Sequence, residues 1–197
     1  GYLHLDTGAM YRAVTVACLR QDLPPQPSPE LNLLLDELDI QFDREAGGDQ
    51  RVLLDGEDIT GQIRTREVNA IVSSYSALPQ VRKRLVKLQQ QTADGHNVVC
   101  EGRDIGTRVF PGARHKFFIV ADLEVRAKRR KDELEAAGTA ANLEELMADL
   151  ARRDEADTIR EHSPLVKADD AIELDTSNLT IEMQVERVIA HVKGRSA

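Results

Sequence analysis

The chain opens with GYLHLDTGAMYRAVTVA, residues 1–17, and this stretch indicates the fold. Residues 2–6 alternate between apolar and polar side chains as a strand does, and residues 7–8 suit a turn. Apolar residues at helical spacing follow over residues 9–19. A strand that leads directly into a helix is the repeating unit of α/β proteins, so we expect more such units further along.

Three later segments repeat this pattern. NVVC (97–100) and KFFIVA (116–121) are short apolar runs of the kind buried in parallel sheets, and AIELDTS (171–177) is a last strand. Each run is followed by polar residues and a helical pattern, and Asn142 is placed to cap one of those helices. The sequence therefore predicts a doubly wound α/β fold, a parallel sheet with helices on both faces.

A different pattern separates the first strand from the others. Four prolines between residues 24 and 29 predict a stiff linker, and helices are predicted over residues 66–77 and from Pro79 onward. Short strands are predicted at residues 39–43, 51–54 and 57–60, joined by turns at residues 46–49 and 55–56. This segment reads as a small antiparallel β insertion.

Composition narrows the class of protein. The formal net charge of −8 over 197 residues argues against a nucleic-acid polymer as partner, because long-range repulsion would oppose binding. The sequence shows neither an apolar run of about 18 residues nor the pattern of a signal peptide. Cys18 and Cys100 lie in apolar settings and read as core rather than as nucleophiles. These features predict a cytoplasmic protein without a membrane segment, and a monomer is the default expectation.

Basic residues nonetheless gather in three places, within residues 82–87, 126–131 and 152–160. Positive clusters in an acidic protein suit a small, concentrated anion such as a phosphate. A solvated helix face is the alternative for any one of them.

In parallel sheets, ligands bind beyond the carboxyl ends of the strands, where helix N-termini offer free N–H groups. That rule selects Asp6, the segment 101–104, the region after Asp122, and residues 175–177. A carboxylate there is often an ordinary helix cap. Arg103 beside Asp104 is more suggestive, since a guanidinium suits a phosphate, although a local ion pair is the alternative.

A second constellation is predicted on one helix. Arg153, Asp157 and Arg160 are spaced four and three residues apart, so they would share one face within an arc of roughly 60°. They form either a phosphate clamp or ordinary surface pairs. Arg126, Arg129 and Arg130 likewise share a face, which would suit a second phosphorylated ligand beneath a lid.

Five motifs along the chain carry a resemblance: LDTGAMYRA, GEDITGQIRT, SALPQVRKRL, EGRDIGTRVFP and RRDEADTIREHSPL. In this order they resemble the signatures of the cytidylate kinase family, whose members phosphorylate CMP and dCMP with ATP and Mg²⁺. The resemblance implies the fold of a P-loop nucleoside monophosphate kinase. It also implies a core domain over residues 1–23 and 80–197, a lid at about residues 126–160, and a monophosphate-binding insertion over residues 24–79.

The resemblance also implies roles for individual residues. Cytosine would be read by Ser73, Arg82 and Asp104, which suits a base with one donor amine and two acceptors on that edge. The other implied contacts are Thr7, Tyr11 and Asp157 for the ribose, Arg12, Arg103 and Arg160 for the acceptor phosphate, Arg153 for the transferred group, and Arg126 and Arg130 for ATP. Arg103, Arg153 and Arg160 would stabilise charge during transfer, and the magnesium ligands stay unassigned.

One family signature has no counterpart here. The 197 residues contain no G-x-x-x-x-G-K-[ST] loop; the nearest pattern, residues 56–62, ends in glutamine and lies in a predicted hairpin. The resemblance therefore implies that a strand, loop and helix of the family are missing in front of residue 1, and that this chain transfers phosphate weakly or not at all. Three alternatives stay open: a non-catalytic pyrimidine nucleotide-binding module, part of a larger fused polypeptide, and a kinase for UMP or AMP.

Overall fold

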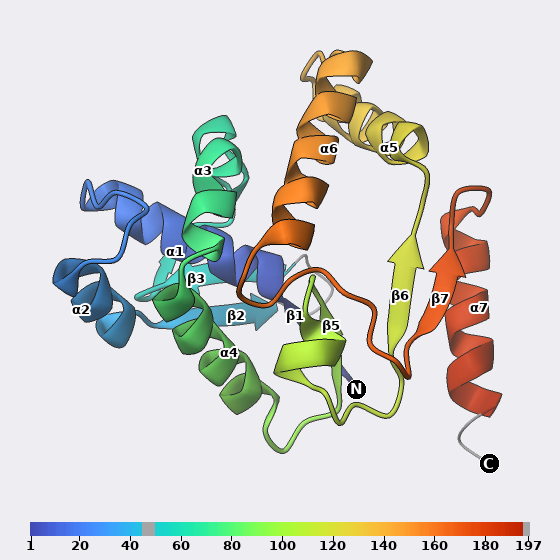
Figure 1. Ribbon diagram of the computed structural model, residues 1–197, viewed down its shortest axis with the longest axis horizontal. Coiled ribbons are helices and arrows are strands. Elements are labelled where there is room, and N and C mark those ends of the chain that lie inside the picture. The colour runs from blue at the N-terminus through green and yellow to red at the C-terminus, as the bar shows by residue number, and fades with distance from the viewer. Residues whose placement is uncertain (45–49, 195–197) are drawn as a thin grey trace. The chain divides into compact units, whose positions relative to one another are not determined.

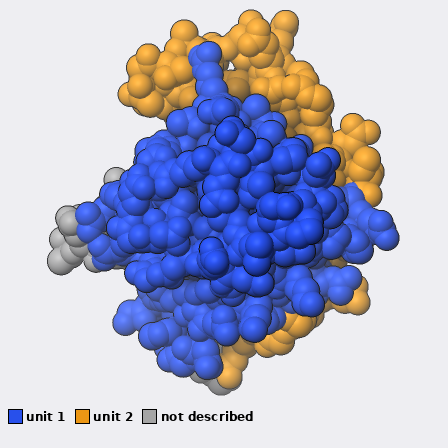
Figure 2. Space-filling view, turned by 90° about the vertical axis from the view of Figure 1, so that its left-hand side faces the viewer, with its two compact units in different colours: residues 1–110, 160–164 blue, residues 111–159, 165–197 orange. Residues whose placement is uncertain are grey.

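The computed structural model describes residues 1–44 and 50–194 (Figure 1). The chain divides into two compact units, Gly1–Phe110 with Arg160–Pro164 and Pro111–Ile159 with Leu165–Ala197 (Figure 2). Parallel strand pairs followed by helices confirm the predicted α/β fold. Among the described residues, every helix is too short or too polar to cross a lipid bilayer.

Within its described residues, the first unit holds one parallel strand pair, one antiparallel sheet and four α-helices. Its elements are β1 (Leu3–Asp6), α1 (Thr7–Arg20), α2 (Pro29–Glu37), β2 (Ile40–Arg44), β3 (Gln50–Leu54), β4 (Glu57–Asp58), η1 (Gln62–Arg64), α3 (Arg66–Ser76), α4 (Pro79–Ala93), β5 (Val98–Glu101) and η2 (Ile105–Val109). The second unit contains β6 (Phe117–Val120), α5 (Leu123–Ala136), α6 (Leu143–Ile159), β7 (Ile172–Asp175) and α7 (Ile181–Gly194).

Helix α1 is the centre of the first unit's core. It follows β1, which pairs in parallel with β5, so that Asp6 lies opposite Glu101 at the carboxyl ends of both strands. Met10 and Val14 on this helix are fully buried, and they belong to the same apolar cluster as Leu31 of α2 and Leu85 of α4. The predicted strand and helix are confirmed, but the predicted turn at residues 7–8 is wrong, because Asp6 caps the helix and Thr7 and Gly8 form its first turn.

The predicted insertion sheet is also present. Strands β2, β3 and β4 pair in antiparallel order, with Ile40 opposite Leu54. The turn at Asp55–Gly56 is confirmed, with φ angles of 51° and 82°. The predicted turn at residues 46–49 lies outside the described residues. The third strand is shorter than predicted and ends at Asp58, because the Asp58 carboxylate accepts a hydrogen bond from the Thr60 N–H and turns the chain away.

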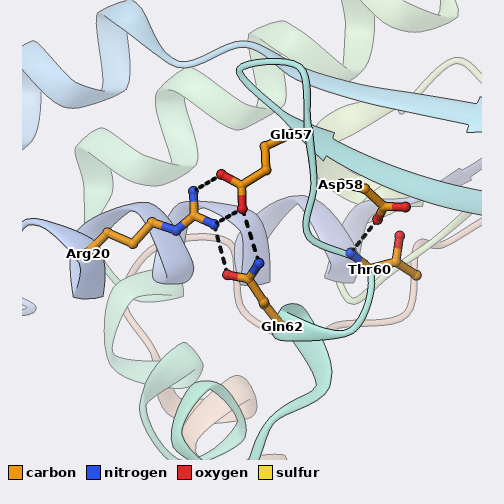
Figure 3. Close-up of polar contacts among 5 residues, drawn as sticks. All are labelled: Arg20, Glu57, Asp58, Thr60 and Gln62. Atoms are coloured by element: carbon orange, nitrogen blue, oxygen red, sulfur yellow. Dashed lines mark hydrogen bonds and ion pairs between the residues drawn. The ribbon is translucent and has the colours of Figure 1, made fainter.

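A polar cluster fastens this insertion to the end of α1 (Figure 3). Arg20 donates two hydrogen bonds to Glu57, at 2.9 and 2.7 Å, and a third to Gln62 at 2.8 Å. These hydrogen bonds, with one from Gln62, hold the pKa of Glu57 below its usual value. The cluster fixes the turn between β3 and β4 against the helix that carries Tyr11 and Arg12.

The second unit is built on the parallel pair β6–β7, with Phe117 opposite Ile172. Helices α5 and α6 pack on each other. Asn142 caps α6 as predicted, because its side-chain oxygen accepts hydrogen bonds from the N–H groups of Glu144 and Glu145.

The prediction that the apolar strands are buried on both faces is wrong. Val99 of β5 is 55% exposed and Ile119 of β6 is 60% exposed, and Ile181 of α7 is 74% exposed. Each parallel sheet has two strands, and the alternating exposure along β5 indicates that only one of its faces is covered.

The predicted helix face of Arg153, Asp157 and Arg160 is also wrong in part. Helix α6 ends at Ile159, so Arg160 lies beyond it and belongs to the first unit. The chain turns back after the helix, where the Leu165 N–H donates to the Asp157 carbonyl and Ser163 adopts a φ of 53°.

Candidate active site

The carboxyl ends of β1 and β5 meet at a tightly packed corner. Asp6 caps α1, because its carboxylate accepts a hydrogen bond of 2.9 Å from the Ala9 N–H. The buried Thr7 hydroxyl donates to the Glu101 carbonyl at 2.7 Å. A side chain at position 102 would bring its Cβ to 2.3 Å from the Thr7 hydroxyl, so only glycine fits there. The corner therefore holds the start of α1 against the segment 101–104.

A buried ion pair lies next to this corner. Arg82 of α4 donates to the carboxylate of Asp104 through Nη2, and through Nη1 to the Ser76 carbonyl at 3.0 Å. The two side chains are only 5% and 4% exposed. The Arg82 Nε atom has no hydrogen-bond partner among the described residues. The two residues that the family resemblance assigned to the cytosine edge are thus in direct contact.

Tyr11 covers the same arginine. The Arg82 guanidinium carbon lies 5.2 Å from the centre of the Tyr11 ring, which is a favourable cation–π geometry. Burial raises the pKa of Tyr11 to about 12, although the positive charges of Arg82 and Arg160 lower it in part. The phenol therefore keeps its proton at neutral pH. Its hydroxyl finds no acceptor among the described residues.

Arg12, one helical position further on, points toward the insertion. Its guanidinium donates to the side-chain oxygen of Asn69 on α3 and to the Ile63 carbonyl at 3.3 Å. Asn69 is in turn fixed by donating to the Arg64 carbonyl at 3.0 Å. Sequence reasoning missed Asn69. The packing of α3 against α1 brings Asn69 to Arg12, and no spacing pattern in the sequence indicates that contact.

The other expected residues of the first unit surround this group. Ser73 is half-buried on α3, and its hydroxyl makes no hydrogen bond among the described residues. Arg103 is exposed directly before Asp104. Arg160 donates to the Ser163 carbonyl at 2.6 Å, and its charge is close enough to lower the pKa of Tyr11. The first unit therefore brings together Tyr11, Arg82, Asp104 and Arg160.

Four expected residues lie in the second unit. Arg126 pairs with Asp154 at 2.7 Å and so joins α5 to α6. Arg130 pairs with Glu133 at 2.9 Å on the exposed face of α5. Asp157 is buried, and Arg153 is half-buried with an Nε atom that lacks a hydrogen-bond partner in the described part of the chain. Their roles toward the first unit's residues stay predictions.

Arg129 does not join Arg126 and Arg130 in a clamp. Its guanidinium donates to the Thr176 carbonyl at 2.5 Å and to the Leu179 carbonyl at 3.3 Å. These bonds hold α5 to the loop after β7, so this arginine is structural.

The cysteines behave as core residues. Burial raises the pKa of the Cys18 thiol to about 11 and that of Cys100 to about 12, so neither is a thiolate at neutral pH. Within residues 1–44 and 50–194, no group of three or more His, Cys, Asp or Glu side chains could hold a metal ion. We therefore assign no magnesium ligands.

Known proteins match this chain along its length. The cytidylate kinase family profile matches residues 1–194. Curated proteins named cytidylate kinase are 44% identical in Halalkalibacterium halodurans, 45% in Geobacter sulfurreducens and 46% in Streptococcus pneumoniae strain 70585. The alignments cover 98%, 99% and 99% of this chain and 87%, 83% and 87% of the respective relatives.

These matches confirm the resemblance drawn from the five motifs and the expectation of a kinase. They do not show that an N-terminal segment is missing, and they do not show that the chain is inactive. The chain belongs to the cytidylate kinase family.

Proposed function

We propose that this protein transfers a phosphoryl group from ATP to CMP or dCMP, giving CDP or dCDP. Membership of the cytidylate kinase family supports the reaction class. The observation that carries the choice of acceptor is the buried pair of Arg82 and Asp104 beneath Tyr11.

The pair suits the hydrogen-bonding edge of cytosine. Its exocyclic amine is a donor that needs an acceptor, and the Asp104 carboxylate uses only one oxygen toward Arg82. Cytosine N3 and O2 are acceptors, and Arg82 retains a buried donor, Nε, without a partner. Uracil presents a carbonyl where cytosine has its amine. That carbonyl would face a carboxylate, which leaves two acceptors unpaired and opposes binding.

The arginines supply the charge that transfer requires. We assign Arg12, Arg103 and Arg160 to the acceptor phosphate, Arg153 to the transferred group, and Arg126 and Arg130 to ATP. Guanidinium groups arranged before the reaction stabilise the charge spread over the phosphoryl oxygens. Magnesium, when bound with ATP, neutralises charge on the phosphates.

We assign the ribose to Thr7, Tyr11 and Asp157. The Thr7 proton is already donated to Glu101, so this hydroxyl would serve as an acceptor for a ribose hydroxyl, while Tyr11 would act as a donor. The division into a core domain, a lid at residues 126–160 and an insertion over residues 24–79 stays a prediction, as do the cytoplasmic location and the monomeric state.

Titration calorimetry with CMP, dCMP, UMP and AMP tests the acceptor. We expect CMP and dCMP to bind at least ten times more tightly than UMP, because the wrong base loses a buried hydrogen bond. Equal affinity for UMP, or preference for AMP, would overturn the assignment to cytosine.

A matched pair of serine variants sharpens this test. Ser73→Ala should weaken CMP binding about 3- to 10-fold, the value of one neutral hydrogen bond, because its hydroxyl is uncommitted in the fold. Ser76→Ala should leave CMP affinity unchanged, because that hydroxyl donates to the Ser73 carbonyl within the same helix. Equal losses of CMP affinity in the two variants would show that α3 affects CMP binding through its packing and not through the Ser73 hydroxyl.

Transfer is measured separately, as CDP formed from ATP and CMP. The second candidate is a non-catalytic pyrimidine nucleotide-binding module, since the buried pair of Arg82 and Asp104 would serve binding alone equally well. Tight CMP binding with no detectable CDP would support that candidate. Turnover that depends on both ATP and CMP would support the kinase.

A further inference from the structure

A cavity in the first unit is lined by basic side chains. It has a volume of about 410 Å³ and lies among α4, η2 and the segment that follows α6. Five of its nine lining residues are basic and none is acidic: Arg82, Lys83, Lys87, Arg108 and His162. This is unexpected in a protein with a net charge of −8. Arg82 is assigned to the acceptor base, and the other four basic residues have no part in the reaction proposed above.

Only two of the four basic residues within residues 82–87 have side-chain partners among the described residues. Arg82 is committed to Asp104, and Arg84 donates to the Leu35 carbonyl at 2.6 Å, near the C-terminal end of α2. Lys83 and Lys87 are exposed, and their side chains make no ion pair or hydrogen bond with the described residues. They are one helical turn apart on α4, so their ammonium groups face the same cavity.

Arg108 adds a positive charge from a second segment of the chain. It lies on η2, is exposed, and its side chain likewise has no partner in the described part of the chain. The exposed His162 completes the lining from a third segment. Three segments that are distant in sequence thus contribute basic side chains to one concave surface. A solvated helix face would involve only one of these segments.

We propose that this cavity binds an oligophosphate group, either free or as part of a nucleoside triphosphate, through Lys83, Lys87 and Arg108, none of which is assigned to the acceptor. The volume lies within the range of small-molecule sites. Several positive charges spread over one helical turn and a second segment suit a chain of phosphates better than a single one. The proposal goes beyond the kinase reaction, since neither Lys83, Lys87 nor Arg108 has a role in it.

Tripolyphosphate is the probe, and its binding to the full chain is measured by titration calorimetry at low salt. The double variant Lys83→Glu/Lys87→Glu should weaken its binding at least tenfold, and Arg108→Glu should weaken it to a similar extent. Arg66→Glu is the control, because this exposed arginine on α3 makes no ion pair or side-chain hydrogen bond with the described residues, yet its substitution changes the net charge equally per residue. Thermal melts establish that each variant is folded.

Two further readouts separate this site from the acceptor site. Saturating CMP should not displace tripolyphosphate, and Lys83→Glu/Lys87→Glu should keep its CMP affinity within about twofold. CTP that binds more tightly than tripolyphosphate identifies a nucleotide as the ligand, and equal binding identifies the phosphates alone; both support the site. Displacement by CMP, or an equal loss per charge in Arg66→Glu, would overturn the proposal, and neither result bears on the choice of CMP as acceptor.

Discussion

The two units contain arginine–carboxylate pairs that differ in burial. In the first unit, Arg82 and Asp104 are paired with side chains only 5% and 4% exposed. In the second, Arg126 and Asp154 are 32% and 29% exposed at 2.7 Å, and the pair of Arg130 and Glu133 is more exposed still. A buried charge cannot exchange its partner for water, whereas a half-exposed one can. The buried pair is therefore fixed in place, whereas the pairs of Arg126 and Arg130 can regroup.

The largest expected effect follows from breaking the buried pair. Arg82→Ala leaves the Asp104 carboxylate buried without its cation, so the free energy of unfolding should fall by about 3–5 kcal/mol. Arg126→Ala is the matched variant in the second unit and should cost about 1 kcal/mol or less. Urea unfolding followed by circular dichroism measures both.

A double variant shows whether the loss comes from the stranded charge. Arg82→Leu/Asp104→Leu removes both charges and should recover much of the stability lost in Arg82→Ala. If Arg82→Ala and Arg126→Ala cost the same, the contrast between the two units would fail.

The next effect tests how rigid the first unit's corner is. A methyl group at position 102 would lie 2.3 Å from the Thr7 hydroxyl and 2.8 Å from the Ile105 side chain. Gly102→Ala should therefore lower the free energy of unfolding by about 1–3 kcal/mol, the usual cost of overpacking. Gly61→Ala is the control, since a methyl group there meets nothing within 4 Å. A neutral Gly102→Ala would mean that the corner yields and is not a fixed surface.

Local signals in the sequence predicted the elements better than the site. The Asn142 cap, the strand-to-helix corner at residue 6 and the turn at Asp55–Gly56 depend on neighbouring residues, and all three are confirmed. The pairing of Arg82 with Asp104 joins residues 22 positions apart, and only the packing of α4 against η2 brings them together. Residue spacing alone suggested Arg103 as the neighbour of Asp104, and family resemblance was needed to select Arg82.

The same limit explains Arg160. Helical spacing placed it on one face with Arg153, since periodicity contains no information about where a helix stops. The turn at Ser163 and the return of the chain to Asp157 are set by backbone contacts that no spacing rule anticipates.

The smallest expected effect concerns the exposed cluster of Arg20 and Glu57, which extends the comparison to a surface pair within the first unit. Hydrogen bonds from Arg20, and then from Gln62, hold the pKa of Glu57 below its usual value. A carboxylate whose pKa is lower in the folded state stabilises the protein fully above its unfolded pKa, about 4.3, and this contribution is lost as the pH falls through the folded pKa.

Glu57→Gln should therefore lower the urea midpoint slightly at pH 6.5, by less than Gly102→Ala does, and the difference from the unsubstituted chain should shrink as the pH falls below about 4. Other carboxylates titrate in the same range, so only the difference between the two proteins is informative. In an Arg20→Met background the difference should be small at every pH, because the main cause of the pKa shift is gone. A difference that persists unchanged from pH 6.5 to pH 3 would mean that the shape of the Glu57 side chain, and not its charge, stabilises the fold. The burial of an ion pair would then not account for its contribution to stability in this unit, as it is expected to for Arg82 and Arg126.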